Sequence, residues 1–122
     1  MPVARITNRM EVGFVLCTFD FTNIHDEREA LATFDEARLF VSAAAPKSLR
    51  ILTDIANTPM PTAVVAGLTE LARHNEPYVE RSALIGLALV HRIALRQIIR
   101  TTGRDLREFK SRAEALAYLR ES

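Results

Sequence analysis

The sequence predicts an α/β domain with a mainly parallel sheet of four to five strands and covering helices. Short apolar segments alternate along the chain with longer segments in which apolar residues recur every three or four positions. Several short segments are apolar on both alternating faces, which is typical of strands covered on both sides. Strands that alternate with helices form parallel sheets through right-handed crossovers, which gives the predicted class.

The composition indicates one globular domain, residues 1–122, of which 48% are apolar and 25% charged. A net charge of +1 gives no electrostatic reason to expect nucleic acid as a partner. No apolar segment reaches the ~18 residues that a membrane span requires. The first eleven residues lack the apolar stretch of a secretion signal. We therefore expect a cytoplasmic protein without a transmembrane segment.

The predicted elements follow the order β-β-α-β-α-β-α-β-α. Asp26 with Glu29, and Ser111 with Glu114, match the capping box that opens a helix. Gly103 is a plausible C-terminal cap because glycine adopts the left-handed conformation easily. The expected ranges are strands at 4–9, 12–21, 49–55, 82–87 and 106–110, and helices at 26–45, 62–74, 89–102 and from 112 onward. In the helix at 89–102, the residues expected to cover the sheet are Leu89, Val90, Ile93, Ala94, Leu95 and Ile98.

The stretch 49–71 is the centre of the prediction and reads as a buried strand, a polar loop and a helix. We expect this strand in the middle of the sheet. Asn57 or Thr58 is the expected N-cap of the helix, because a short side-chain oxygen can accept from free backbone N–H groups. Ligands and modification sites gather at the carboxyl ends of parallel strands. Asp54, Thr58 and Thr62 are therefore candidate binding residues.

Three segments carry a resemblance to a known family: S-L-R-I-L-T-D-I, H-N-E-P-Y-V-E-R-S-A-L-I-G-L and T-T-G-R-D-L-R-E-F-K-S-R-A-E-A-L-A-Y-L. Together with the arginine-rich helix before the last segment, they resemble the STAS-like family (sulfate transporter and anti-sigma-factor antagonist). Within this family the chain resembles the small stand-alone bacterial STAS-like proteins, over about residues 10–119. It implies a STAS-like topology and a non-catalytic regulatory or protein-interaction role.

The best-known STAS members carry D-S-S-G or D-S-T-G after the central strand, and a partner kinase phosphorylates a serine there. The corresponding residues here are Pro61-Thr62-Ala63-Val64, which lack the aspartate and the glycine. Only Thr62 offers a hydroxyl, with Thr58 nearby. This departure argues against a phosphorylation switch and favours Thr62 as an ordinary first-turn residue.

Arginines recur every four residues in the predicted helix 89–102, at Arg92, Arg96 and Arg100, so they share one helix face, which Arg104 could extend. They are candidates for binding an anionic partner, such as an acidic protein surface or a lipid headgroup. The alternative is a solvated face, which the low net charge favours. Like charges at this spacing repel, so we expect Glu108 or Asp105 to offset them.

The sequence offers no arrangement typical of an enzyme or a metal site. The three histidines lack metal-ligand spacing, and we find no nucleophile motif and no phosphate-binding or dinucleotide-binding loop. Asp20 and Asp54 both end predicted strands and could form an acid–base pair, but loop hydrogen bonding is the commoner role. We expect no catalytic residues, no metal and no cofactor.

Two functions remain open at this point. The first is a regulatory or protein-interaction module, with its surface at residues 56–61 and the N-terminus of the following helix. The alternative is a small lipid or apolar-ligand binding protein, by analogy with CRAL-TRIO domains. A homodimer, formed through the arginine face or through the helix at 26–45, is compatible with either function.

Overall fold

The structure, a computed structural model, describes residues 4–121 and shows the expected alternation of strands and helices. The predicted domain, 1–122, extends past this range by a few terminal residues. In chain order the elements are β1 (Ile6–Glu11), β2 (Phe14–Asp20), α1 (Glu27–Ser42), β3 (Leu49–Asp54), α2 (Thr62–Asn75), β4 (Val79–Ile85), the 3₁₀-helix η1 (Leu89–His91), α3 (Arg92–Thr102), β5 (Leu106–Glu108) and α4 (Arg112–Leu119).

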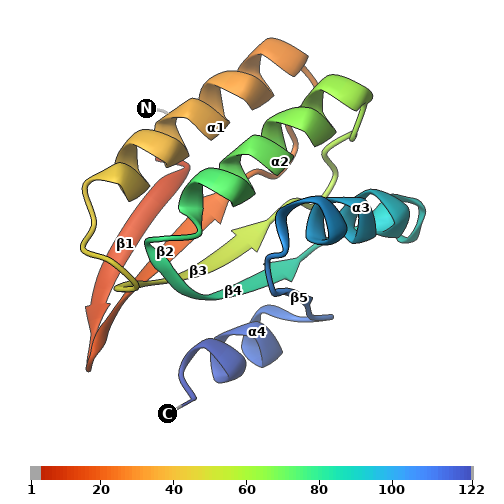
Figure 1. The fold of residues 1–122 in the computed structure, drawn as a ribbon. Coiled ribbons are helices and arrows are strands. Elements are labelled where there is room, and N and C mark those ends of the chain that lie inside the picture. Colours follow the sequence, from red (N-terminus) through yellow and green to blue (C-terminus); the bar gives the residue numbers. More distant parts are fainter. Residues whose placement is uncertain (1–3, 122) are drawn as a thin grey trace.

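The strands form one five-stranded sheet in the order β1-β2-β3-β4-β5. β1 and β2 pair antiparallel, and the other neighbours pair parallel. β3 is central, as expected for the strand at 49–55. Helices α1, α2 and α3 lie on one face of the sheet and α4 lies on the other (Figure 1). The predicted α/β class with a mainly parallel sheet is confirmed.

The sheet carries a hydrophobic core on each face, because side chains alternate along each strand. In β2, Cys17 and Phe19 belong to the core beneath α1 and α2, whereas Leu16 belongs to the opposite core. That second core also contains Ala115 and Leu119 of α4. The two-sided burial explains why β2 and β3 read as continuous apolar runs.

Two predicted helix starts differ from the structure. Asp26 caps α1 by accepting from the Arg28 N–H at 2.9 Å, but Glu29 pairs with Arg5 instead of completing a capping box. The N-cap of α2 is Pro61, so the prediction of Asn57 or Thr58 was wrong. Both of those side chains are occupied by contacts with the loop after β2, which the sequence did not reveal.

Several predicted boundaries moved by two or three residues. The first helix ends at Ser42 rather than at 45, and β1 begins at Ile6 rather than at 4. β4 begins at Val79 rather than at 82, so that the charged residues Glu80 and Arg81 belong to the strand. It ends at Ile85 rather than at 87, before Gly86, whose φ is +80°. The helix expected over 89–102 begins as a 3₁₀ turn and becomes α-helical only at Arg92.

Two predicted helix caps are confirmed. Gly103 ends α3 in the left-handed conformation, with φ at +70°, and donates its N–H to the Ile99 carbonyl at 2.8 Å. The Ser111 hydroxyl accepts from the Glu114 N–H at 3.2 Å and opens α4.

Candidate functional site

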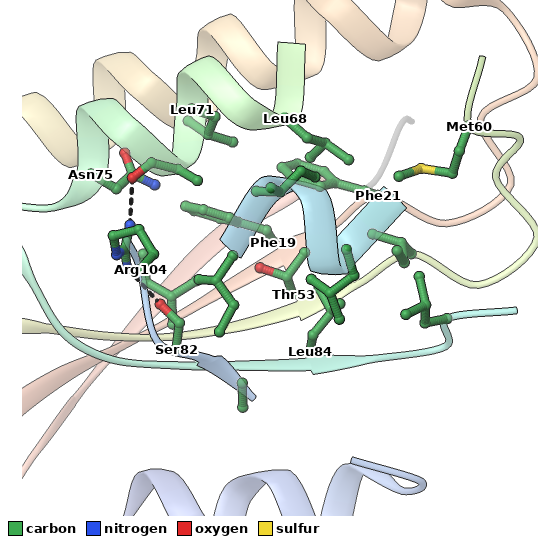
Figure 2. Close-up of a pocket in the computed structure, with 18 residues that line it drawn as sticks. Phe19, Phe21, Thr53, Met60, Leu68, Leu71, Asn75, Ser82, Leu84 and Arg104 are labelled. Atoms are coloured by element: carbon green, nitrogen blue, oxygen red, sulfur yellow. Dashed lines mark hydrogen bonds between the residues drawn. The ribbon is translucent and has the colours of Figure 1, made fainter. Parts of the chain in front are cut away.

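A cavity of about 80 Å³ lies between α2, α3 and the sheet (Figure 2). Eighteen residues line it, from β2, β3, β4, β5, both helices and the adjoining loops. All of them are apolar except Thr53, Asn75, Ser82 and Arg104. A concave, mostly apolar space with a few polar groups is the usual form of a small-molecule site.

Two of the sheet side chains that line the cavity are small. Thr53 of β3 and Ser82 of β4 project toward the helices where longer apolar side chains would fill the layer. From the other side, Ile98 is the one fully buried residue of α3, with Leu95 partly buried beside it. Neither layer reaches far enough to close the gap.

One end of the cavity is polar and is lined by the positively charged side chain of Arg104. The Arg104 guanidinium donates from Nη1 to the Ala72 carbonyl at 2.5 Å and from Nη2 to the Ser82 hydroxyl at 3.0 Å (Figure 2). Burial lowers the pKa of Arg104 from its usual value, although the charges of Glu76 and Asp105 act in the opposite direction. The guanidinium is therefore held against neutral acceptors at the end of an apolar space.

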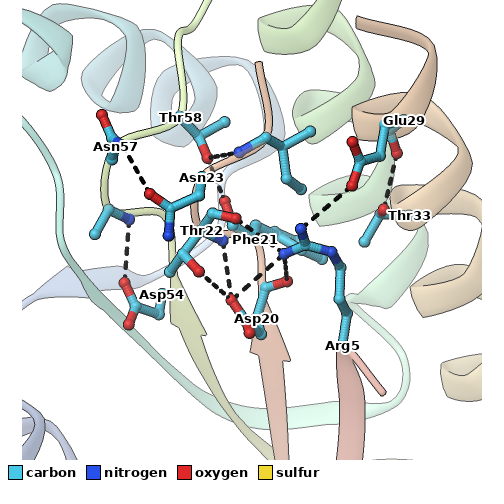
Figure 3. A network of polar contacts seen from close by, with 12 residues as sticks. Arg5, Asp20, Phe21, Thr22, Asn23, Glu29, Thr33, Asp54, Asn57 and Thr58 are labelled. Carbon is cyan, nitrogen blue, oxygen red and sulfur yellow. Dashed lines mark hydrogen bonds and ion pairs between the residues drawn. The ribbon is translucent and has the colours of Figure 1, made fainter. Parts of the chain in front are cut away.

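The carboxyl ends of β2 and β3 form a second polar cluster (Figure 3). Thr58 lies inside it: its hydroxyl donates to the Phe21 carbonyl at 2.5 Å and accepts from the Ile24 N–H at 3.1 Å. Asn57 donates from its side-chain amide to the Asn23 side-chain oxygen at 2.7 Å. These contacts join the loop after β3 to the loop after β2.

The two strand-end carboxylates each serve their own loop. Asp54 accepts from the Ala56 N–H at 3.1 Å and pairs with Arg112 at 3.3 Å. Asp20 accepts from the N–H and hydroxyl of Thr22 at 3.0 and 2.6 Å. Burial raises the pKa of Asp20, but the Thr22 bonds and nearby arginine charges outweigh it and lower the pKa overall. Both carboxylates act as hydrogen-bonded loop caps.

The predicted arginine face divides into one paired and two unpaired side chains. Arg92 pairs with Glu108 at 3.2 Å, as expected from the charge pattern. Arg96 and Arg100 are exposed and make no ion pair or hydrogen bond with any residue in 4–121. Asp105, the other expected partner, pairs with Arg107.

Apolar side chains lie beside the two unpaired arginines. Leu89, Val90 and Ile93 are 74–76% exposed, although the sequence pattern predicted that they cover the sheet. Leu89 and Val90 lie in the 3₁₀ turn η1, before the α-helical repeat begins at Arg92, and Ile93 lies in the first turn of α3. Thr62, at the start of α2, is exposed and borders the open groove between α2 and α3 together with Val90 and Ile93.

No protein-family model matches the chain, and no curated protein matches it. A solved structure does. It is the crystal structure of an uncharacterised protein of the DUF3478 family with a SpoIIAA-like fold, from Shewanella loihica PV-4. The TM-score is 0.59 at 13% sequence identity, over 93% of this chain and 91% of that one. The fold is SpoIIAA-like.

The SpoIIAA-like fold confirms the STAS-like resemblance at the level of topology. In the structure, the junction where the sequence analysis put Thr58 and Thr62 runs from the end of β3 at Asp54 to the start of α2 at Thr62. Of the two hydroxyls, Thr58 is 5% exposed and used internally, whereas Thr62 is open to solvent. The structure does not bring Asp54, Thr58 and Thr62 together with Arg92, Arg96 and Arg100 into one site.

Sequence reasoning missed the cavity and Arg104. It placed Arg104 at the end of the arginine face of the helix, but the left-handed Gly103 turns the chain and directs the side chain inward. The useful signal was the T-G-R order itself, because a residue after a helix-ending glycine no longer follows the helical repeat. No helix among residues 4–121 is long and apolar enough to cross a membrane. No group of three potential metal ligands occurs there either.

Proposed function

We propose that this SpoIIAA-like protein is a non-catalytic binding protein for a small apolar ligand, which occupies the cavity between α2, α3 and the sheet. The observation that carries this proposal is the cavity itself, whose lining is apolar at all but four of eighteen positions. The network of polar contacts at the strand ends argues against catalysis, since each strand-end carboxylate already caps a loop.

The energetics of the cavity favour a ligand. An unfilled core cavity costs roughly 24 cal/mol per Å³, so 80 Å³ corresponds to about 2 kcal/mol of lost contacts. A molecule of matching shape would recover much of this free energy. Because one water-sized group needs about 10–15 Å³, the space suits a chain of roughly six such groups. A short aliphatic chain meets this requirement.

A thermal-shift series with 1-butanol, 1-hexanol and 1-octanol tests the proposal, together with native mass spectrometry of freshly purified protein. We expect the midpoint to rise most with 1-hexanol. Thr53→Leu should fill the cavity, raise the midpoint without ligand and abolish the response to 1-hexanol. The matched control is Thr7→Leu on β1, an exposed strand threonine far from the cavity. The absence of any alcohol response in the unmodified protein would refute the proposal.

A second candidate function is the regulatory or protein-interaction module, with an acidic protein as partner. The observation that favours it is the surface formed by Leu89, Val90 and Ile93 beside the unpaired Arg96 and Arg100. This surface offers apolar area and positive charge together, which an acidic partner surface would complement.

Affinity capture with purified protein tests the second candidate. A specific partner should be retained by the unmodified protein and by Val12→Ser, which changes an apolar side chain that is fully exposed in the β1–β2 turn. It should be lost with Ile93→Ser and with Arg96→Glu. Light scattering on the same samples distinguishes a separate partner from a second copy of the chain. Equal capture by all four proteins would exclude this surface.

A further inference from the structure

The cavity is amphipathic along its length. Figure 2 shows Arg104, Ser82 and Asn75 gathered at one end, with Phe19, Leu84 and Leu68 in the middle and Met60 at the far end. A ligand that fills this space therefore meets three hydrogen-bonding side chains at one end, and elsewhere only the Thr53 hydroxyl near the middle. Such a gradient fixes the orientation of a ligand that has one polar and one apolar end.

The Arg104 guanidinium at the polar end makes no direct ion pair with any residue in 4–121, although the charges of Glu76 and Asp105 act on it from beyond ion-pair distance. Other inward-facing arginines are matched by carboxylates: Arg50 pairs with Glu80 at 2.5 Å, and Arg5 with Glu29 at 3.3 Å. Arg104 has no carboxylate within ion-pair distance among residues 4–121, and its two hydrogen bonds go to a carbonyl and a hydroxyl. A guanidinium has five N–H donors, so it retains donors for a further acceptor.

A second polar group at this end also retains capacity. Asn75 is buried, and its side-chain oxygen lies 3.0 Å from Nδ1 of His74. Its amide nitrogen makes no hydrogen bond within the described part of the chain. An acceptor placed between Asn75 and Arg104 could thus receive hydrogen bonds from both side chains. A negatively charged acceptor would in addition form the direct ion pair that Arg104 does not make with residues 4–121.

We infer that the ligand is a short amphiphilic carboxylate, whose carboxylate group is bound by Arg104 and whose aliphatic chain fills the apolar part of the cavity. This inference rests on the proposed function and specifies the chemical class of its ligand. A guanidinium matches a carboxylate in a planar, bidentate geometry. The small volume favours the planar carboxylate over the larger tetrahedral phosphate.

The test compares two ligands with the same chain, hexanoate and 1-hexanol, by isothermal titration at pH 7.5. The unmodified protein should bind hexanoate roughly 10- to 100-fold more tightly, the range expected for a charge-assisted hydrogen bond. Arg104→Gln should remove this preference and leave 1-hexanol binding within about threefold of its original value. Arg100→Gln, which removes an exposed and unpaired charge from α3, should retain the preference.

The outcomes separate the inference from the proposed function. Equal affinity for hexanoate and 1-hexanol would overturn the inference and leave the apolar-ligand function standing. Binding of neither ligand would overturn both. A preference for hexanoate that persists in Arg104→Gln would overturn the inference, because another group would then bind the carboxylate. Tighter binding of hexyl phosphate than of hexanoate would also overturn it, because the ligand would then be a phosphate and not a carboxylate.

Arg104 also joins α2 to β4, so Arg104→Gln could unfold the protein. The comparison of the two ligands on the unmodified protein does not depend on this variant. Ser82→Ala offers a second check, because it removes one neutral hydrogen bond and keeps the charge. We expect Ser82→Ala to retain the preference for hexanoate, and loss of the preference in this variant would contradict the role assigned to the Arg104 charge.

Discussion

The Thr58 hydroxyl donates to the Phe21 carbonyl over 2.5 Å, joining two loops that are more than thirty residues apart in the sequence. The same hydroxyl accepts from the Ile24 N–H, and the side chain is buried. Thr58→Val keeps the shape but leaves the carbonyl and the N–H without partners. An unsatisfied buried polar group costs about 1–3 kcal/mol, so we expect the free energy of unfolding in urea to fall by about 2 kcal/mol.

The matched control is Thr62→Val, four residues further on and exposed at the start of α2. Its effect should stay below about 0.5 kcal/mol, as for ordinary surface substitutions. Equal effects of the two substitutions would show that the Thr58 contacts do not stabilise the fold.

Gly86 follows β4 with φ at +80° and lies against the loop after β3. A Cβ atom at this position would be 2.6 Å from the Ala56 backbone nitrogen and 2.6 Å from Oδ1 of Asp54. Gly86→Ala therefore adds a steric clash to the left-handed strain. We expect thermal and urea denaturation to show a loss of about 3 kcal/mol or more.

Gly13 provides the control because its φ is +89° but nothing lies within 4 Å of a Cβ atom there. Gly13→Ala carries the conformational cost alone, about 1–2 kcal/mol. If Gly86→Ala costs no more than Gly13→Ala, the close approach of the two loops contributes nothing to stability.

The fold was predictable because the apolar patterns reflect burial directly. The run from Leu49 to Ile55 favoured a strand covered on both faces, and its expected central place in the sheet is confirmed by its pairing with β2 and β4. Boundaries were less predictable where long-range contacts decide them. Thr58 has the right chemistry for an N-cap, but a carbonyl from a distant loop takes its hydroxyl, and no local pattern encodes that choice.

The candidate site was less predictable than the fold, because a cavity is a property of what two layers fail to fill. Small residues such as Thr53 and Ser82 look ordinary in a strand, and only the position of α3 above them creates the space. Similarly, a regular arginine spacing placed Arg104 with its neighbours on one helix face. The turn at Gly103 removes it from that face.

Cys17 provides a pH-dependent prediction. Burial raises the pKa of its thiol to about 12, from an ordinary value of 9.0. The unfolded chain releases the proton above pH 9 while the folded chain retains it, so the contribution to stability is complete below pH 9. It is then lost as the pH rises toward 12, at up to about 1.4 kcal/mol per pH unit.

Urea denaturation at pH 8 and pH 10.5 measures this contribution. The unmodified protein should lose about 2 kcal/mol more over this interval than Cys17→Ala, which has no thiol to titrate. Cys17→Ala removes core volume and is less stable at both pH values, so the comparison concerns the slope alone. Parallel pH dependences would contradict the raised pKa.

Arg50 attaches α4 to the opposite face of the sheet. Its Nη1 donates to the Leu119 carbonyl at 2.7 Å and to the Glu121 carbonyl at 3.0 Å, while its guanidinium lies 4.1 Å from the centre of the Phe14 ring. It therefore satisfies free carbonyls at the C-terminal end of α4, where a positive charge is favourable. The side chain is only 11% exposed, so solvent screens these contacts little.

Arg50→Met keeps the apolar stem over Phe14 and removes the charge and the donors. We expect a loss of about 2 kcal/mol in the free energy of unfolding, because hydrogen bonds from a charged group contribute about 1.5–3 kcal/mol. Hydrogen exchange should accelerate first in α4, since that helix loses its terminal contacts. Arg9→Met on β1 is the control: its side chain is 64% exposed, and its ion pair with Glu11 at 3.6 Å should contribute below about 0.5 kcal/mol. Uniform acceleration of exchange across the sheet and α4 in Arg50→Met would mean that Arg50 stabilises the domain as a whole and does not specifically hold α4.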